Sequence, residues 1–181
     1  MMDVADGELL ARFQQGDAGA FGMLYERYKS GLYGYALSLC HEASQAQDVV
    51  QELWLKFIER AGSIGAEVNL RPYLFTALRN LVIDQARRKK SEQRALEGQA
   101  RQRPLLLEPV DPVAGAEEAA RVNAALAELP EDQRETLLLK MYGPFTFEEL
   151  AEVVKAPAKT VMSRYRLALE KLGKALESES E

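Results

Sequence analysis

The sequence predicts an all-α protein of two small helical domains joined by a flexible, Pro-rich linker. Apolar residues recur at helical spacing along most of the chain, and no alternating run bounded by turn signals indicates a strand. The helical pattern breaks between residues 93 and 115, where three of the seven prolines lie. We therefore expect domains at residues 1–92 and 116–177, with the linker at 93–115 between them.

The N-terminal domain is expected to contain five helices. Gly16 ends the first, and Asp17 can cap the second, which carries apolar residues at helical spacing as far as Tyr28. The fourth ends before a loop that begins at Gly62, and Pro72 suits the first turn of the fifth. The expected ranges are 6–15, 17 to at least 28, 32–41, 45–60 and 71–90.

The C-terminal domain is expected to end in a helix-turn-helix. Helices resume near Glu117, and Gly143-Pro144 interrupts the pattern before the last pair. Thr146 and Glu149 have the spacing of a capping box, which contributes about 1 kcal/mol. The first helix of the pair ends near Val154, and the segment "KAPAK" turns the chain into the second.

Composition and charge limit the class of protein. Hydrophobic residues make up 47% of the 181 residues, enough for a buried core, and the single cysteine, Cys40, excludes an internal disulfide. The start has no basic leader and no apolar run approaches a membrane span, so a cytoplasmic protein without membrane insertion is expected. The net charge is −5, but residues 71–103 hold 9 basic and 3 acidic side chains. Such a local positive field can attract phosphates.

The last helix has the residue types that read duplex DNA. Lys159, Thr160, Ser163 and Arg166 lie on one side of its first two turns, opposite an apolar side. Side chains of this kind reach base edges when a helix enters the major groove. The alternative is an amphipathic helix whose polar side only meets water.

The helix at 45–60 has a possible docking face. Asp48, Gln51, Glu52 and Leu55 lie opposite its apolar side, and an exposed leucine among acids and an amide suits a basic, helical partner. The alternative is a solvated face with one incidental leucine.

The helix at 71–90 carries a second stripe beside its apolar side. An aromatic ring can stack on an unpaired base, an amide can bond a base edge, and cations can hold the backbone, which is the chemistry of single-strand binding. The alternative is a basic helix end that the helix dipole favours. The stripe consists of Tyr73, Thr76, Asn80, Ile83 and Arg87, followed by Arg88, Lys89 and Lys90.

Together these segments resemble an extracytoplasmic-function (ECF) sigma factor, the small two-domain class of bacterial sigma factors. "AQDVVQELWLKF" resembles the polymerase-docking helix of that family, and "RPYLFTALRNLVIDQARRKK" resembles its promoter-melting and −10-reading helix. "LPEDQRETLLLKMYGPFTFEELAEVVKAPAKTVMSRYRLALEKL" resembles its −35-reading domain. The resemblance spans nearly the whole chain outside the linker, with the segments in the family's order.

The resemblance implies a protein that lends promoter specificity to core RNA polymerase and is not itself an enzyme. It implies docking on the β′ clamp and the β flap, binding of promoter DNA, and control by an anti-sigma factor. Polymerase contacts would come from Asp48, Gln51, Glu52 and Leu55. The −10 contacts would come from Tyr73, Thr76, Arg79, Asn80, Asp84, Arg87 and Arg88. The −35 contacts would come from Lys159, Thr160, Met162, Ser163, Arg164 and Arg166.

Three positions depart from the family pattern. Met162 stands where a cation is usual, Tyr73 where a tryptophan is usual, and Lys155 where the turn usually has glycine. Tyr73 preserves base stacking, whereas Lys155 must avoid a positive φ or accept strain.

Two other classes remain open from the sequence. One is a conventional helix-turn-helix regulator, and the other is a helical adaptor that mimics a sigma factor and binds only proteins. No cofactor is expected, and the single histidine, His41, beside Cys40 lacks the further ligands of a zinc site.

Overall fold

The computed structural model describes residues 4–96 and 116–178, and every regular element in these residues is helical. The N-terminal part contains α1 (Asp6–Gln14), α2 (Ala18–Cys40), α3 (Ala43–Arg60), the short 3-10 turn η1 (Ala61–Ser63) and α4 (Leu70–Leu96). The C-terminal part contains α5 (Ala116–Ala127), α6 (Glu131–Tyr142), α7 (Phe147–Val154) and α8 (Ala158–Ser178). The predicted all-α class with two helical domains is confirmed.

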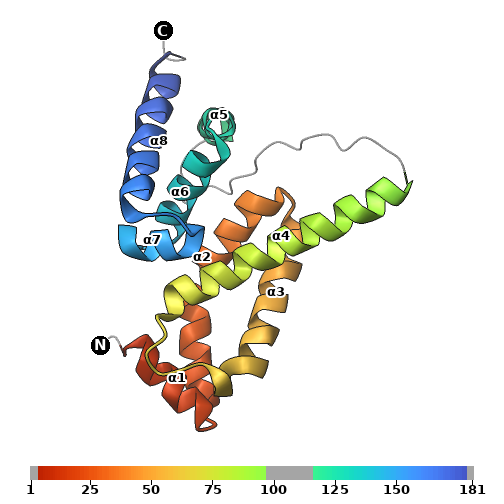
Figure 1. Cartoon of the computed structure of the whole chain (residues 1–181), viewed down its shortest axis with the longest axis vertical. Coiled ribbons are helices and arrows are strands. Elements are labelled where there is room, and N and C mark those ends of the chain that lie inside the picture. Colours follow the sequence, from red (N-terminus) through yellow and green to blue (C-terminus); the bar gives the residue numbers. More distant parts are fainter. Residues whose placement is uncertain (1–3, 97–115, 179–181) are drawn as a thin grey trace.

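Helix α4 runs across the front of the bundle formed by α1, α2 and α3, and the C-terminal helices stand beside its first half (Figure 1). It continues to Leu96, past the boundary expected at residue 92. The rest of the predicted linker lies outside the described residues. The exact limits of the two domains therefore stay a prediction.

The second and third predicted helices are one continuous helix, α2. Asp17 caps it as expected, because its carboxylate accepts hydrogen bonds from the backbone N–H groups of Gly19 (2.9 Å) and Ala20 (3.2 Å). The predicted break between Tyr28 and Leu32 is wrong. Gly31 lies between these two residues, and a glycine inside a helix costs about 1 kcal/mol. This cost is too small to end a helix whose neighbouring turns are buried.

Gly31 also has a packing role. A Cβ atom at this position would lie 2.3 Å from the backbone oxygen of Tyr142, at the end of α6. The absence of a side chain therefore lets α2 and α6 approach each other closely.

One apolar core runs through both halves of the chain. Leu24, Leu53 and Leu74 belong to the same buried cluster as Leu138 and Val161. Phe75 of α4 and Phe145, which follows α6, meet edge to face with ring centroids 4.9 Å apart. The two domains are thus packed against each other in this structure.

Several finer packing predictions need correction. Trp54, which was not assigned to the core, is buried, and Val50 and Val82, which helical spacing places on the apolar sides of their helices, are half-buried against the core. Helical spacing puts Leu169 of the last helix on the same side as Val161 and Ala168, but those two residues are buried and Leu169 is 45% exposed.

Candidate nucleic-acid interface

A groove of about 690 Å³ lies between α3 and α4 and contains most of the predicted single-strand stripe. Tyr73, Thr76 and Asn80 face it from α4, and Asn80 is exposed while the other two are half-buried. This base groove, as we call it, therefore offers an aromatic ring, a hydroxyl and an amide within one concave surface. Asp84 lines the same groove one turn further along.

The opposite wall of the base groove supplies positive charge. Lys56 and Arg60 line it from α3, and Asn69 lines it from the loop before α4. Sequence reasoning did not single out Lys56 and Arg60. Their i, i+4 spacing puts Lys56 and Arg60 on one face of α3. The sequence does not show that this face lies beside α4, so it could not predict that the two cations line a groove.

The loop wall of the groove is held by α1. The side-chain amide of Gln14 donates hydrogen bonds to the carbonyl oxygens of Ala61 (2.7 Å) and Ile64 (2.9 Å). Ile64 and Leu70 are buried at the two ends of the loop. The groove is thus largely preformed, which lowers the ordering cost of binding.

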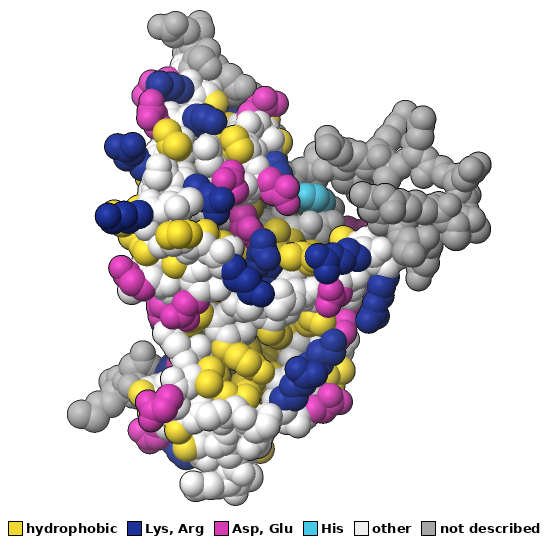
Figure 2. Space-filling view, viewed as in Figure 1, with side chains coloured by type: hydrophobic (Ala, Val, Ile, Leu, Met, Phe, Trp, Pro, Cys, Tyr) yellow, Lys and Arg dark blue, Asp and Glu magenta, His cyan; other side chains and the backbone are white. Residues whose placement is uncertain are grey.

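Arg87 and Arg88 lie on the exposed, distal part of α4. Arg87 pairs with Asp84 at 3.8 Å, but both side chains are mostly in solvent, so this ion pair is weak. Figure 2 shows basic side chains gathered across the front of the molecule where α4 runs and along its outer edge near α8. Clustered cations of this kind can attract a phosphate backbone.

Arg79, another predicted −10 residue, does not face the base groove. Its guanidinium binds the carboxylate of Glu135 on α6 through two hydrogen bonds, Nε to Oε1 at 2.6 Å and Nη2 to Oε2 at 3.2 Å. The hydrogen bond to Glu135 raises the pKa of Arg79. In this structure Arg79 joins the two domains.

The predicted docking face of α3 is open. Asp48, Gln51 and Leu55 are exposed, Leu55 by 58%. Glu52 is half-buried, and its pKa is lowered by hydrogen bonds from Lys56 and then Gln85. A second groove, of about 830 Å³, runs beside this face between α2 and α3 and is walled by Tyr25, Trp54, Leu55 and Ile58. The sequence did not reveal this groove, because its walls come from two helices.

The helix-turn-helix forms as predicted. The Thr146 hydroxyl accepts the backbone N–H of Glu149 (3.2 Å), and the Glu149 carboxylate accepts that of Thr146 (2.8 Å), which completes the capping box. Phe145 and Leu150 are both buried at this helix start. Lys155 ends α7 with φ 53°, a left-handed conformation that glycine adopts freely and that strains a lysine.

The N-terminal turns of α8 present a polar face to solvent. Arg164, in contrast, binds Asp132 of α6 at 2.8 Å and helps to hold α8 on the domain. In this structure Arg164 therefore positions α8, and its predicted −35 contact stays a prediction. The exposed face consists of Lys159, Thr160, Met162, Ser163 and Arg166.

Within residues 4–96 and 116–178, no group of three or more His, Cys, Asp or Glu side chains could hold a metal ion. No helix in these residues is long and apolar enough to cross a membrane.

Comparisons with known proteins match both halves of the chain. Residues 24–92 match Sigma-70 region 2, and residues 119–172 match Sigma-70 region 4. The RNA polymerase sigma-H factor of Pseudomonas aeruginosa is 30% identical over 95% of this chain and 94% of its own length. The ECF RNA polymerase sigma factor EcfG of Rhodopseudomonas palustris is 34% identical over 80% of this chain and 78% of its own length.

A solved structure has the same fold over most of the chain. The sigma factor RpoE of Bartonella quintana, in complex with the anti-sigma factor NepR, superposes with a TM-score of 0.74 and 27% identity. The match covers 87% of this chain and 96% of that one. The chain belongs to the sigma-70 family, within its ECF group. It is a sigma factor, a non-enzymatic protein that binds RNA polymerase and directs promoter-specific transcription initiation.

Proposed function

We propose that the base groove captures unpaired bases of the −10 element while the exposed face of α8 reads the −35 element as duplex. The observation that carries this proposal is the groove between α3 and α4. It combines the Tyr73 ring, the Asn80 amide and the cations Lys56 and Arg60 in one concave surface. Stacking, edge recognition and backbone neutralisation are the three contacts that single-stranded DNA requires.

Polymerase docking falls to α3 in this proposal. Asp48, Gln51, Glu52 and Leu55 contact the clamp coiled coil of β′, and the adjoining groove beside Trp54 receives apolar side chains of the same partner. The C-terminal domain sits on the β flap. A few apolar residues packed into grooves often supply most of the binding free energy of an interface, and the exposed Leu55 beside an apolar groove is suited to this role.

The C-terminal domain places the start of α8 in the major groove. Lys159, Ser163 and Arg166 are exposed on this part of α8 and carry donors that suit base edges and phosphates. Met162, 50% exposed, replaces a cation by an apolar side chain that suits a thymine methyl group.

An anti-sigma factor holds the chain until a signal releases it. The support for this part of the proposal is that the structural relative from Bartonella quintana was solved with its anti-sigma factor. A partner of core RNA polymerase acts in the cytoplasm.

Asn80→Ala and Tyr73→Ala test the base groove. Each variant is expected to slow promoter opening strongly, because each removes a contact that only unpaired DNA makes. Permanganate reactivity of −10 thymines measures opening, and gel filtration with core polymerase provides the control, since both residues lie away from the docking face of α3. Wild-type opening in both variants would reject the groove as the −10 site.

A further inference from the structure

The loop between α3 and α4, residues 61–69, walls one side of the base groove. Arg60 lines the groove just before this loop, and Val68 and Asn69 line it near the end of the loop. The only regular structure inside the loop is the short turn η1. The shape of the groove on this side therefore depends on how the loop is held.

Few contacts of its own restrain the loop. Ala61 and Ile64 are buried and Val68 is half-buried, but the other residues of the loop are exposed. Gly62 and Gly65 add backbone freedom. A Cβ atom at either glycine would meet nothing within 4 Å, so packing does not restrain the loop at these two positions.

The side chain of Gln14, at the end of α1, supplies a restraint. Its Nε2 donates hydrogen bonds to the carbonyl oxygens of Ala61 at 2.7 Å and Ile64 at 2.9 Å. Ala61 begins η1 and Ile64 follows it, and the Ile64 N–H donates to the same Ala61 carbonyl oxygen at 3.1 Å. An amide NH2 group has two donor hydrogens, and this contact uses both. One side chain therefore fixes both ends of the turn.

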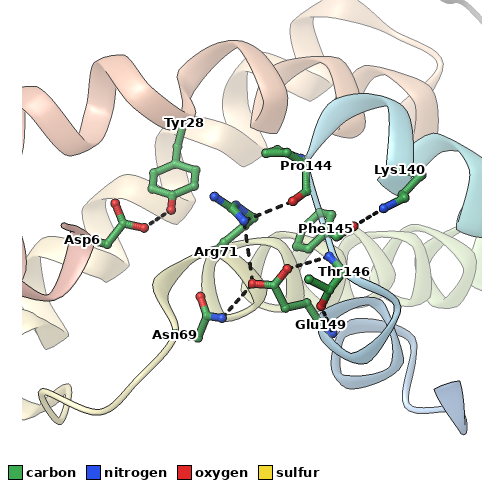
Figure 3. A network of polar contacts seen from close by, with 9 residues as sticks. All are labelled: Asp6, Tyr28, Asn69, Arg71, Lys140, Pro144, Phe145, Thr146 and Glu149. Atoms are coloured by element: carbon green, nitrogen blue, oxygen red, sulfur yellow. Dashed lines mark hydrogen bonds and ion pairs between the residues drawn. The ribbon is translucent and has the colours of Figure 1, made fainter. Parts of the chain in front are cut away.

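Helix α1 is itself fixed on α2, so Gln14 projects from a rigid support. Near the start of α1, Asp6 accepts hydrogen bonds from Arg27 and from the Tyr28 hydroxyl, and Figure 3 shows the second of these. Near its end, Nη2 of Arg12 donates to Oδ2 of Asp17 at 2.8 Å. Two leucines of α1 are also buried in the core.

The first turn of α1 approaches the loop as well. A Cβ atom at Gly7 would lie 3.6 Å from the carbonyl oxygen of Ala66, which is an ordinary contact distance. Helix α1 thus lies along the loop, and Gln14 is the side chain that bonds it.

We propose that Gln14 is a positioning residue for −10 recognition. Gln14 does not line the base groove, so it acts on DNA through the loop, by holding Arg60 and Asn69 at the spacing that an unpaired base requires. The inference rests on the proposed role of the base groove. It adds a residue that lies outside the groove and outside the segments that the sequence assigned to DNA binding.

The physical reason is the entropy of the loop. A free loop must lose backbone freedom before it can hold a base, and this loss weakens binding. The two hydrogen bonds from Gln14 order the loop when the chain folds, before DNA arrives. Promoter opening should therefore be slower when the donor is lost, although no contact with DNA has been removed.

The first test changes the hydrogen-bonding character of residue 14 in the full chain. In Gln14→Glu the carboxylate only accepts hydrogen bonds and faces two carbonyl oxygens, whereas in Gln14→Lys the ammonium group still donates. Permanganate reactivity is measured with core polymerase at a promoter that the wild-type chain opens. Opening is expected to slow on the order of tenfold in Gln14→Glu, since two hydrogen bonds are lost, and to stay close to the wild type in Gln14→Lys.

Gln15, the next residue, is exposed and provides the matched control. Gln15→Glu places the same charge beside the first position and keeps the Gln14 amide, so its promoter opening should match the wild type. Circular dichroism and gel filtration with core polymerase check that each variant folds and docks. Gln14→Ala, which removes the amide without adding a charge, takes the place of Gln14→Glu if that variant loses its helix content.

A second readout separates positioning from a general loss of function. Templates with one abasic site at each position of the non-template −10 strand identify the base whose removal slows opening by the wild type most. In Gln14→Glu, loss of that base should slow opening little further, because the loop no longer holds it and the two losses do not add. A merely structural defect would slow opening of every template by the same factor.

The inference is overturned if Gln14→Glu opens promoters like the wild type, or if Gln15→Glu or Gln14→Lys is slowed as much as Gln14→Glu. An abasic-site profile that is the same in Gln14→Glu and the wild type would also overturn it. The proposed function fails separately, if Asn80→Ala opens promoters as well as the wild type.

Discussion

Lys155 occupies a backbone conformation that favours glycine. Its φ of 53° ends α7, and the next residue, Ala156, donates its N–H to the Ala151 carbonyl at 3.1 Å. A side chain in this left-handed region costs roughly 1–2 kcal/mol.

Lys155→Gly is therefore expected to stabilise the protein by roughly 0.5–1 kcal/mol, after the greater freedom of glycine in the unfolded chain is subtracted. Chemical denaturation measures the change. Lys171→Gly, at an exposed position inside α8, should do the opposite and cost about 1 kcal/mol. Destabilisation by both substitutions would show that Lys155 carries no strain.

Arg164 and Arg166 are two residues apart and have different surroundings. Arg164 is bound to Asp132, and Arg166 is exposed on the face of α8 proposed to enter the major groove. Arg166→Ala should cost about 1–3 kcal/mol on the preferred −35 sequence, and less on others, if it contacts a base. Arg164→Ala should lower thermal stability and weaken all promoters alike. Transcription from a set of −35 variants separates these outcomes, and identical profiles would contradict the distinction.

At the residue level the sequence predicted local interactions well. The Asp17 cap and the Thr146–Glu149 capping box involve residues within three positions of each other, and both are present. The role of Arg79 could not be predicted in the same way, because its partner, Glu135, lies 56 positions along the chain. Helical spacing alone gives no information about such a contact.

Helix α3 separates three tasks by its faces. Leu53 and Phe57 enter the core, Asp48 and Leu55 stay exposed on the proposed docking face, and Lys56 lines the base groove. The amphipathic pattern predicted the first two faces. The third face, with Lys56, becomes part of a groove only because α4 lies beside it. The sequence of α3 alone does not show where α4 lies.

Leu55→Arg is expected to abolish association with core polymerase, because it puts a charge at the centre of an apolar contact. Since Leu55 is 58% exposed, the helix content and thermal stability should stay near the wild type. Analytical gel filtration with core polymerase measures binding. Glu8→Arg, at an exposed position of α1 outside both grooves, controls for the added charge. Retained polymerase binding by Leu55→Arg would show that docking uses another surface.

The continuity of α2 shows how packing can override a sequence signal. The sequence was interpreted as two helices here, yet the helix is continuous and its Gly31 allows the close approach of Tyr142. Packing against Tyr142 of the C-terminal domain offsets the cost of a glycine inside the helix. An accurate prediction of α2 thus required knowledge of how the domains pack.

On the scale of the whole molecule, the two domains form one body in the described structure, with a shared core and acidic contacts at its edge. The sequence predicted both domains and a tether. It could not predict that they pack together, because the contacts join residues far apart in the chain.

The domain boundary gives the stability a dependence on pH. Burial opposes the charged form of Glu149, but hydrogen bonds from Thr146 and Asn69 and the nearby Arg71 outweigh it and hold its pKa below the ordinary 4.5. A lowered carboxyl pKa stabilises the folded chain above the ordinary value, and this stabilisation is lost as pH falls through the lowered pKa. Unfolding free energies of wild type and Glu149→Gln should therefore differ near neutral pH and converge in acid. A constant difference would contradict this role of Glu149.

Transcription reconstituted from the purified chain and core polymerase on a library of genomic fragments tests the division of labour between the two domains most directly. We expect initiation at discrete sites that share two short upstream elements. Thymines of the downstream element should become reactive to permanganate, and Asn80→Ala should remove that reactivity. The division of labour would be contradicted if the chain bound polymerase but started transcription at no site. It would also be contradicted if the Asn80→Ala variant opened promoters as well as the wild type.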